Sequence, residues 1–195
     1  EWAITAGSIY ANPERYLNEK ITALRPRTKE LVTLALIRLA VSDPEAAAIE
    51  ADKLRWKAQL TLEERSWVWG VIGKRAAQKL SDGAVTYFLN GQDKFMHDDH
   101  LAWKVRSALR ASNWDQVTTA IAAMSETQRK DPTWVYWRAR ALLNQAQTEA
   151  DRAEASHLLG SIASTRGFYE QLALEELGHR VTAPERPLPL TDEEK

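Results

Sequence analysis

The stretch that decides the fold occurs three times: Trp69-Gly-Val-Ile-Gly73, Trp103-Lys-Val-Arg-Ser107 and Trp137-Arg-Ala-Arg-Ala141. Each copy begins with a tryptophan and ends four residues later on a small residue, and successive copies start 34 residues apart. Residues four apart lie on the same face of a helix, so each copy places a large ring next to a gap. A second helix can approach closely at such a gap. The pattern therefore predicts a series of paired helices.

A period of 34 residues is typical of tetratricopeptide-like helical hairpins. Some apolar positions of that repeat are charged here, for instance Arg106 and Arg140, so an irregular helical bundle stays open as the alternative interpretation. The predicted fold class is all-α, with a right-handed superhelix of stacked antiparallel helical hairpins, tetratricopeptide-like, over residues 1–178.

Composition and helix-start signals agree with this prediction. The chain contains 29 Ala and 22 Leu against 9 Val and 8 Ile, which favours helix formers over the β-branched residues of strands. Helix starts are predicted where a capping side chain precedes proline, at Asn12, Asp43 and Asp131, and where Thr61 and Glu64 have capping-box spacing. Further N-caps are expected at Asp82, Asp98 or Asp99, Asn113 and Thr148.

Charge and length exclude several classes of function. The 195 residues carry 26 basic and 27 acidic side chains, a formal net charge of −1, which argues against the basic surface that nucleic acids select. No run reaches the roughly 18 to 20 uncharged apolar residues of a membrane span. Cysteine is absent, and no glycine-rich phosphate-binding motif occurs. Neither nucleic acid, nor a membrane span, nor a cofactor is therefore predicted.

No catalytic residue is predicted in this chain. Nucleophile motifs are absent, and neighbouring glutamates on one helix do not face each other across a cleft as acid and base must. His97-Asp98-Asp99-His100 contains residue types that bind divalent metals. Adjacent residues on a turn seldom converge on one ion, so we interpret this run as a polar turn that caps the helix beginning near Leu101, not as a metal site.

The eight tryptophans provide the best candidates for binding. Trp134 and Tyr136 lie beside Arg138 and Arg140 in one predicted helix. An aromatic ring can stack on a sugar or peptide, and a guanidinium can donate hydrogen bonds to the same ligand. Trp137 fits better as a core residue, whereas Trp134 and Tyr136 fit a core or a binding role about equally. We predict that these four residues bind a glycan or a partner protein.

Residues 179–195 differ in composition from the rest of the chain. Prolines occur at 184, 187 and 189, followed by the polar sequence Thr191-Asp-Glu-Glu-Lys195. Such a segment cannot continue a helix, and it is typical of an extended linker. We expect it to lead toward a further module.

Two runs in the last third of the chain resemble the end of the superhelical region of soluble lytic murein transglycosylases. They are Trp134-Val-Tyr-Trp-Arg-Ala-Arg-Ala-Leu142 and Arg166-Gly-Phe-Tyr-Glu-Gln-Leu-Ala-Leu-Glu-Glu-Leu-Gly178. Residues 34–40, 42–48 and 103–124 look like earlier hairpins of the same domain, in the expected order. The resemblance covers residues 27–178, and Glu170 departs from it because family members often have glycine there.

The resemblance implies a function for the whole enzyme and a different one for this piece. The family's enzymes cleave the β-1,4 bond between N-acetylmuramic acid and N-acetylglucosamine to 1,6-anhydro products, through a glutamate in a lysozyme-like domain. The Glu-Ser and Gly-Leu-Met-Gln motifs of that domain are not in this sequence. The chain is therefore expected to be a non-catalytic superhelical (U) domain in the periplasm, a scaffold that contacts peptidoglycan strands or cell-wall synthesis proteins. The alternative is a tetratricopeptide-like adaptor that binds a partner protein.

Overall fold

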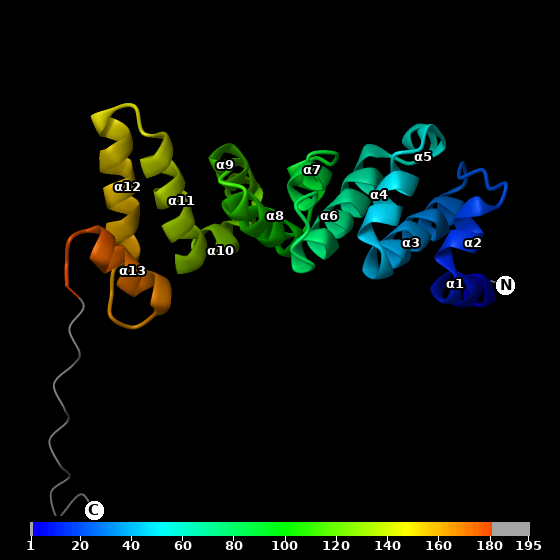
Figure 1. Ribbon diagram of the computed structural model, residues 1–195, viewed down its shortest axis with the longest axis horizontal. Helices are drawn as coiled ribbons and strands as arrows, with labels where there is room; N and C mark the ends of the chain where they lie inside the picture. The colour runs from blue at the N-terminus through cyan, green and yellow to red at the C-terminus, as the bar shows by residue number, and fades with distance from the viewer. Residues whose placement is uncertain (1, 181–195) are drawn as a thin grey trace, which may run out of the picture. The chain divides into compact units, whose positions relative to one another are not determined.

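All regular structure in the described part of the chain is helical (Figure 1). The structure, a computed structural model, describes residues 2–180, and no β-strand occurs within that range. The helices are α1 (Trp2–Ala11), α2 (Pro13–Asn18), α3 (Pro26–Ser42), α4 (Pro44–Ala51), α5 (Leu54–Gln59), α6 (Leu62–Gln78), α7 (Ala84–Phe88), the 3-10 helix η1 (Asp93–Phe95), α8 (Asp98–Arg110), α9 (Trp114–Ala123), α10 (Glu126–Arg129), α11 (Pro132–Gln145), α12 (Glu149–Ile162) and α13 (Phe168–Glu176). The predicted all-α class is confirmed.

The chain forms two compact units. The first unit ends at Trp134 and the second begins at Val135, so that the boundary falls inside α11. None of the helices between residues 2 and 180 is both long and apolar enough to cross a membrane. Most of the predicted linker, from residue 181 onward, lies outside the described residues.

The first unit is built from consecutive helix pairs. Helices α3 and α4, α6 and α7, and α8 and α9 pack against each other, and α6 also contacts α3, α4 and α8. Figure 1 shows these pairs side by side in chain order. Leu36, Trp56 and Ile72 are among the largest fully buried side chains. The predicted hairpin arrangement is therefore present within this unit.

The small residues of α6 determine how closely its neighbours approach. A Cβ atom added at Gly73 would lie 2.7 Å from Cδ1 of Phe88 in α7, and one added at Gly70 would lie 2.8 Å from Nδ1 of His100 in α8. Carbon atoms in van der Waals contact are about 3.5–4.0 Å apart, so neither position has room for a side chain. The small residue that follows Trp69 by one turn has the role predicted for it.

Most of the predicted helix starts are confirmed. Side chains of Asn12, Asp43 and Asn113 accept hydrogen bonds from backbone N–H groups three residues later, at 2.9, 2.9 and 3.1 Å. Thr61 and Glu64 form a capping box, with distances of 3.1 and 2.7 Å, and Thr148 caps α12 in the same manner.

Two predicted N-caps are wrong, because the carboxylates have other partners. His97 caps α8, since its Nδ1 accepts from the Asp99 N–H at 3.3 Å, whereas Asp98 accepts from the Ser125 N–H at 2.8 Å. Asp82 lies near Arg110 instead of capping α7, whose N-cap position is Gly83 with no side-chain bond.

Three helices end in the same C-terminal motif. After α6, the Ser81 N–H donates to the Ala76 carbonyl and the Leu80 N–H to the Ala77 carbonyl, both at 3.0 Å. Leu80, the second residue after the end of α6, has a left-handed backbone conformation, with φ of 59°. Ser112 and Gly178 occupy the equivalent position after α8 and α13, with φ of 54° and 85°. Glycine is the usual residue at this position because other side chains are strained there.

The second unit contains most of α11 together with α12 and α13. Its core consists of Tyr136 and Ala139 from α11, Ala155 and Leu159 from α12, and Ala173 from α13. Trp137, which we expect to be a core residue, is half-buried and packs against this cluster.

Candidate functional site

The aromatic residue Trp134, predicted to bind a ligand, is buried in the first unit. Its side chain is 5% exposed, and its indole Nε1–H donates to Oε1 of Gln128 at 3.1 Å. The guanidinium carbon of Arg106 lies 5.5 Å from the centre of its ring. The indole is therefore enclosed by α8 and α10 residues, and little of its face is open to solvent.

Tyr136 and Arg140 meet at one carboxylate in the second unit. The Tyr136 hydroxyl donates to Oε1 of Glu176 at 3.4 Å, and Arg140 forms an ion pair with the same oxygen. The pKa of Tyr136 is raised, mainly by burial. The charge of Arg140 lowers the pKa and the charge of Glu176 raises it, so these two effects oppose each other. The phenol therefore stays neutral at physiological pH and acts as a hydrogen-bond donor that links α11 to α13.

Arg138 is the most exposed of the four predicted residues. Its side chain is 49% exposed and pairs with Glu154 of α12 at 3.0 Å, whereas the Arg140 side chain is 35% exposed. Within the second unit, Tyr136 and Arg140 both contact Glu176. Arg138 instead contacts Glu154. The two arginines are thus the members of the predicted set that present polar groups to solvent.

Of the histidine cluster, His97 caps α8, but the helix begins at Asp98 instead of near Leu101, so the other three residues form its first turn. The backbone N–H of His97 donates to Nδ1 of His100 at 3.4 Å. His100 is buried, and its ring centre lies 4.9 Å from that of Trp67 in an edge-to-face arrangement. Burial is the main cause that lowers the pKa of His100 to about 4. No group of three metal-ligating side chains converges in residues 2–180.

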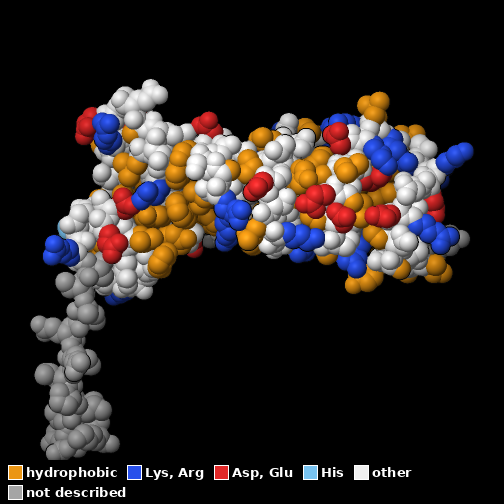
Figure 2. All heavy atoms as spheres, in the orientation of Figure 1, with side chains coloured by type: hydrophobic (Ala, Val, Ile, Leu, Met, Phe, Trp, Pro, Cys, Tyr) orange, Lys and Arg blue, Asp and Glu red, His pale blue; other side chains and the backbone are white. Residues whose placement is uncertain are grey.

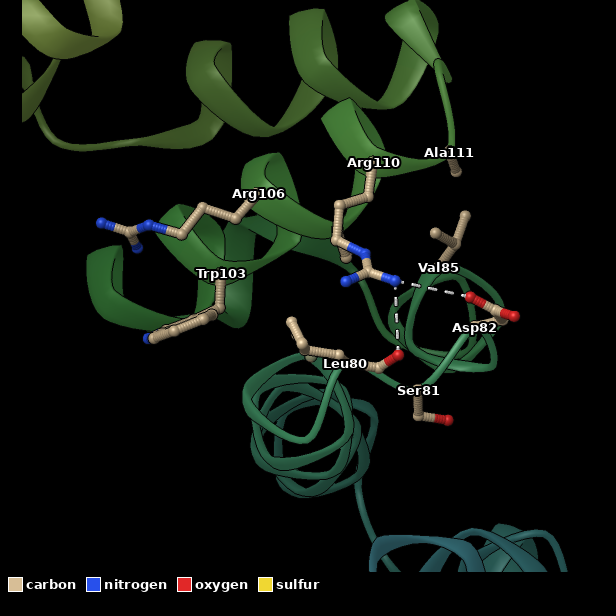
Figure 3. Close-up of a pocket in the computed structure, with 10 residues that line it drawn as sticks. Leu80, Ser81, Asp82, Val85, Trp103, Arg106, Arg110 and Ala111 are labelled. Atoms are coloured by element: carbon tan, nitrogen blue, oxygen red, sulfur yellow. Dashed lines mark hydrogen bonds and ion pairs between the residues drawn. The ribbon is translucent and has the colours of Figure 1, made fainter.

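A pocket that is not among the predicted sites lies at the end of α6, between α7 and α8 (Figure 3). Its volume is about 470 Å³, within the roughly 300–1,000 Å³ of small-ligand pockets. The apolar side of the pocket includes the half-buried ring of Trp103 and the side chains of Leu80 and Val85. Arg106 and Arg110 line the same cavity. The complete lining is Ala77, Leu80, Ser81, Asp82, Val85, Trp103, Arg106, Ser107, Arg110 and Ala111.

Positive charge is only partly neutralised in this pocket. Arg110 donates to the Leu80 carbonyl at 3.4 Å and lies 3.7 Å from Asp82, whose side chain is fully solvent-exposed at 102%. Arg106 stacks on Trp103, with its guanidinium carbon 4.8 Å from the ring centre. None of the ion pairs found within residues 2–180 involves Arg106. The face of the first unit that is visible in Figure 2 has no such bias, since acidic and basic side chains are interspersed over it.

The sequence contained a signal for this pocket. Trp103, Arg106 and Arg110 follow the i, i+3, i+7 spacing of one helix face. The repeat pattern by itself presents Arg106 as a charged departure from the consensus and gives no sign of the second wall. The other wall comes from the turn after α6, which is 20 to 30 residues away in sequence and whose course depends on the left-handed Leu80.

Comparison with known proteins supports the resemblance stated above. The chain matches no protein-family model. It is 23% identical over 177 residues to the soluble lytic murein transglycosylase of Escherichia coli K12, covering 88% of this chain and 26% of the relative. It is 22% identical over 156 residues to the protein of the same name from Salmonella typhimurium, covering 80% of this chain and 24% of the relative.

The fold is shared with a solved structure. An inactive mutant of the lytic transglycosylase Slt from Pseudomonas aeruginosa matches with a TM-score of 0.71 and 24% identity, over 99% of this chain and 31% of that chain. The chain thus spans about a quarter of the length of the curated relatives that it matches. The resemblance found in the sequence is confirmed, and the chain is homologous to a helical segment of the soluble lytic murein transglycosylases.

Proposed function

We propose that this chain is a non-catalytic helical segment of a periplasmic peptidoglycan lytic transglycosylase. Its role is that of a scaffold and a binding surface for glycan strands or for proteins of cell-wall synthesis. The observation that carries the proposal is the match across 88% of this chain to enzymes of which it covers only 26%. The reaction itself, cleavage between N-acetylmuramic acid and N-acetylglucosamine to a 1,6-anhydro end, is assigned to a catalytic domain of the parent enzyme.

Two carboxylates of the described residues, Glu50 and Asp82, have partners or surroundings that bear on their roles. Acid and base catalysis on a glycosidic bond needs a carboxyl group that is free to exchange a proton inside a cleft. Glu50 is the buried carboxylate in residues 2–180, and it accepts from the Trp56 indole N–H at 2.9 Å and pairs with Lys53. Asp82, at the candidate pocket, is fully exposed. Both groups fit structural roles better than chemical ones.

In the second unit, we propose that Arg138 and Arg140 contact the glycan or the partner protein. The predicted aromatic partners then have a packing role and do not present a solvent-exposed ring to the ligand. Trp134 holds α11 in the first unit, and Tyr136 holds it in the second unit. Arg138 has the more exposed guanidinium, so a ligand can displace Glu154 from it with little loss, because exposed ion pairs contribute about 0–1 kcal/mol.

Retention of the chain on purified sacculi tests this proposal. The chain should sediment with sacculi, and Arg138→Gln combined with Arg140→Gln should reduce the bound fraction. Arg152→Gln is a matched control, because Arg152 is an exposed arginine of the same unit that pairs with Glu149 at 3.5 Å. If the double variant is retained as well as the unchanged chain, the proposed role of Arg138 and Arg140 in binding is refuted. A chain that does not sediment with sacculi at all would refute the glycan-binding role.

A further inference from the structure

We infer that the pocket lined by Trp103, Arg106 and Arg110 is a binding site for a carboxylate-bearing peptidoglycan fragment. The inference rests on the proposed function for the source of the ligand, and it assigns the site to the first unit, away from the four residues predicted from sequence. Its basis is a cavity lined by an indole and two arginines; Figure 3 shows the Arg110 guanidinium directed at Leu80 and Asp82, and the Arg106 side chain extending away from it on the side of Trp103.

The charge of the pocket points to an anion. Two arginines line it and the carboxylate beside them, Asp82, is 3.7 Å from Arg110 and fully in solvent. A single exposed carboxylate screens Arg110 weakly and leaves Arg106 without an ionic partner among the described residues. Arginine presents a planar fork of donors that fits a carboxylate with two parallel hydrogen bonds. The site therefore has donors in place for one carboxylate.

The apolar wall points to a group beside that carboxylate. Trp103 stacks with Arg106 at 4.8 Å, which orients the guanidinium and leaves the half-buried indole as part of the wall. Leu80 completes the wall with a side chain that is 62% exposed. A ligand that carries a carboxylate next to a sugar ring or an aliphatic group covers these surfaces while its carboxylate pairs with one of the arginines.

Leu80 is itself an unusual residue for its position. Its φ of 59° lies in the left-handed region, where a side chain costs roughly 1 kcal/mol relative to glycine. The side chain is mostly exposed, so burial in the core does not compensate for this strain. A contact with a ligand at the pocket gives the exposed leucine a role that the packing of the free chain does not.

Peptidoglycan offers two sources of such a carboxylate, the lactyl group of N-acetylmuramic acid and the C-terminus of a peptide stem. Three probes distinguish these two sources: N-acetylmuramic acid, N-acetylglucosamine and N-acetyl-D-alanyl-D-alanine. The first carries the carboxylate on a sugar, the second is the same sugar without the lactyl group, and the third carries the carboxylate on a peptide. The cavity volume of about 470 Å³ accommodates each of these ligands.

Titration of the whole chain with each probe, followed by calorimetry or by amide chemical shifts, tests the inference. Binding of either carboxylate probe with shifts at residues 80–85 and 103–111, and about tenfold or weaker binding of N-acetylglucosamine, is expected. Arg106→Gln should lower the affinity about tenfold or more, whereas Arg27→Gln, at an exposed arginine of α3, should not change it. Binding of N-acetylglucosamine as tight as that of the better carboxylate probe, or binding of none of the probes, would overturn the inference.

Leu80→Gly provides a second test that does not depend on a charged residue. This variant removes the apolar wall and relieves the left-handed strain, so weaker binding together with a higher melting temperature is expected. A merely structural leucine would give the higher melting temperature with unchanged affinity, and that result would count against the site. The two proposals fail separately: a chain retained on sacculi that binds none of the probes contradicts only the pocket, and a chain that binds them but is not retained contradicts only the sacculus-binding function.

Discussion

Replacement of Gly73 by alanine should destabilise the first unit, although alanine is the better helix former. In the helix interior, Gly→Ala alone stabilises by about 1 kcal/mol. At Gly73, however, the new Cβ would lie 2.7 to 2.8 Å from Cδ1, Cδ2 and Cε1 of Phe88. Phe88 is completely buried, so its ring has no free space into which to move.

The magnitude follows from the balance of these two effects. Overpacking of a close-packed core costs about 1–3 kcal/mol, and here three ring atoms are pressed at once. After subtraction of the propensity gain, Gly73→Ala should lower the free energy of unfolding by up to about 2 kcal/mol. Gly7→Ala in α1 is the matched control, because no atom lies within 4 Å of a Cβ there, and it should be neutral or stabilising.

Urea unfolding followed by far-UV circular dichroism measures the difference, provided that the slope of the transition is unchanged between variants. The double variant Gly73→Ala, Phe88→Leu should show a favourable coupling, because the smaller side chain makes room for the new methyl group. Equal stability of Gly73→Ala and Gly7→Ala would refute the claim that α7 approaches α6 through the small residue of the repeat.

Two further predictions concern buried polar groups of the first unit. The side chain of Lys104 is 5% exposed and pairs with Asp93 at 2.6 Å. Lys104→Met should therefore lower the free energy of unfolding by about 3 kcal/mol, because it leaves the Asp93 carboxylate without its partner. In urea unfolding, Lys104→Met combined with Asp93→Asn should recover part of this loss, and an unchanged stability of Lys104→Met would contradict the prediction. His100 has its pKa lowered to about 4 from 6.5 by burial, so the unfolded chain binds the proton more tightly. The free energy of unfolding should therefore be highest above pH 6.5 and fall by up to about 3 kcal/mol toward pH 4; the loss should be smaller in His100→Asn, and equal pH profiles for the two proteins would refute this assignment.

Local signals predicted the fold well. The N-caps at Asn12, Asp43, Thr61 and Asn113 depend on hydrogen bonds that span three residues, so their spacing is visible in the sequence. The small residue at Gly73 was equally predictable, since one turn of helix separates it from Trp69.

The C-terminal ends of the helices were less predictable. Two of the three left-handed positions hold Leu80 and Ser112, where glycine is expected. A search for glycine finds Gly178 and misses the other two. The course of the turn after α6, and with it one wall of the pocket, was therefore not apparent from residue types.

The binding residues show the limit of helical spacing as a guide. Position within α11 did not distinguish a ring on the surface from one in the core, and both Trp134 and Tyr136 are 5% exposed. Their burial depends on helices that are distant in sequence, such as α8 for Trp134 and α13 for Tyr136. The pocket was missed for the same reason, because three separate helices form its lining.

One measurement tests most directly the proposal that this chain binds and that a separate domain of the parent enzyme catalyses the reaction. Purified sacculi are incubated with the isolated chain or with the full-length parent enzyme, and released fragments are analysed by mass spectrometry for 1,6-anhydromuropeptides. The proposal expects these fragments from the full-length enzyme and none from the chain alone, even when the chain is retained on the sacculi. Sustained release of anhydromuropeptides by the isolated chain would contradict it.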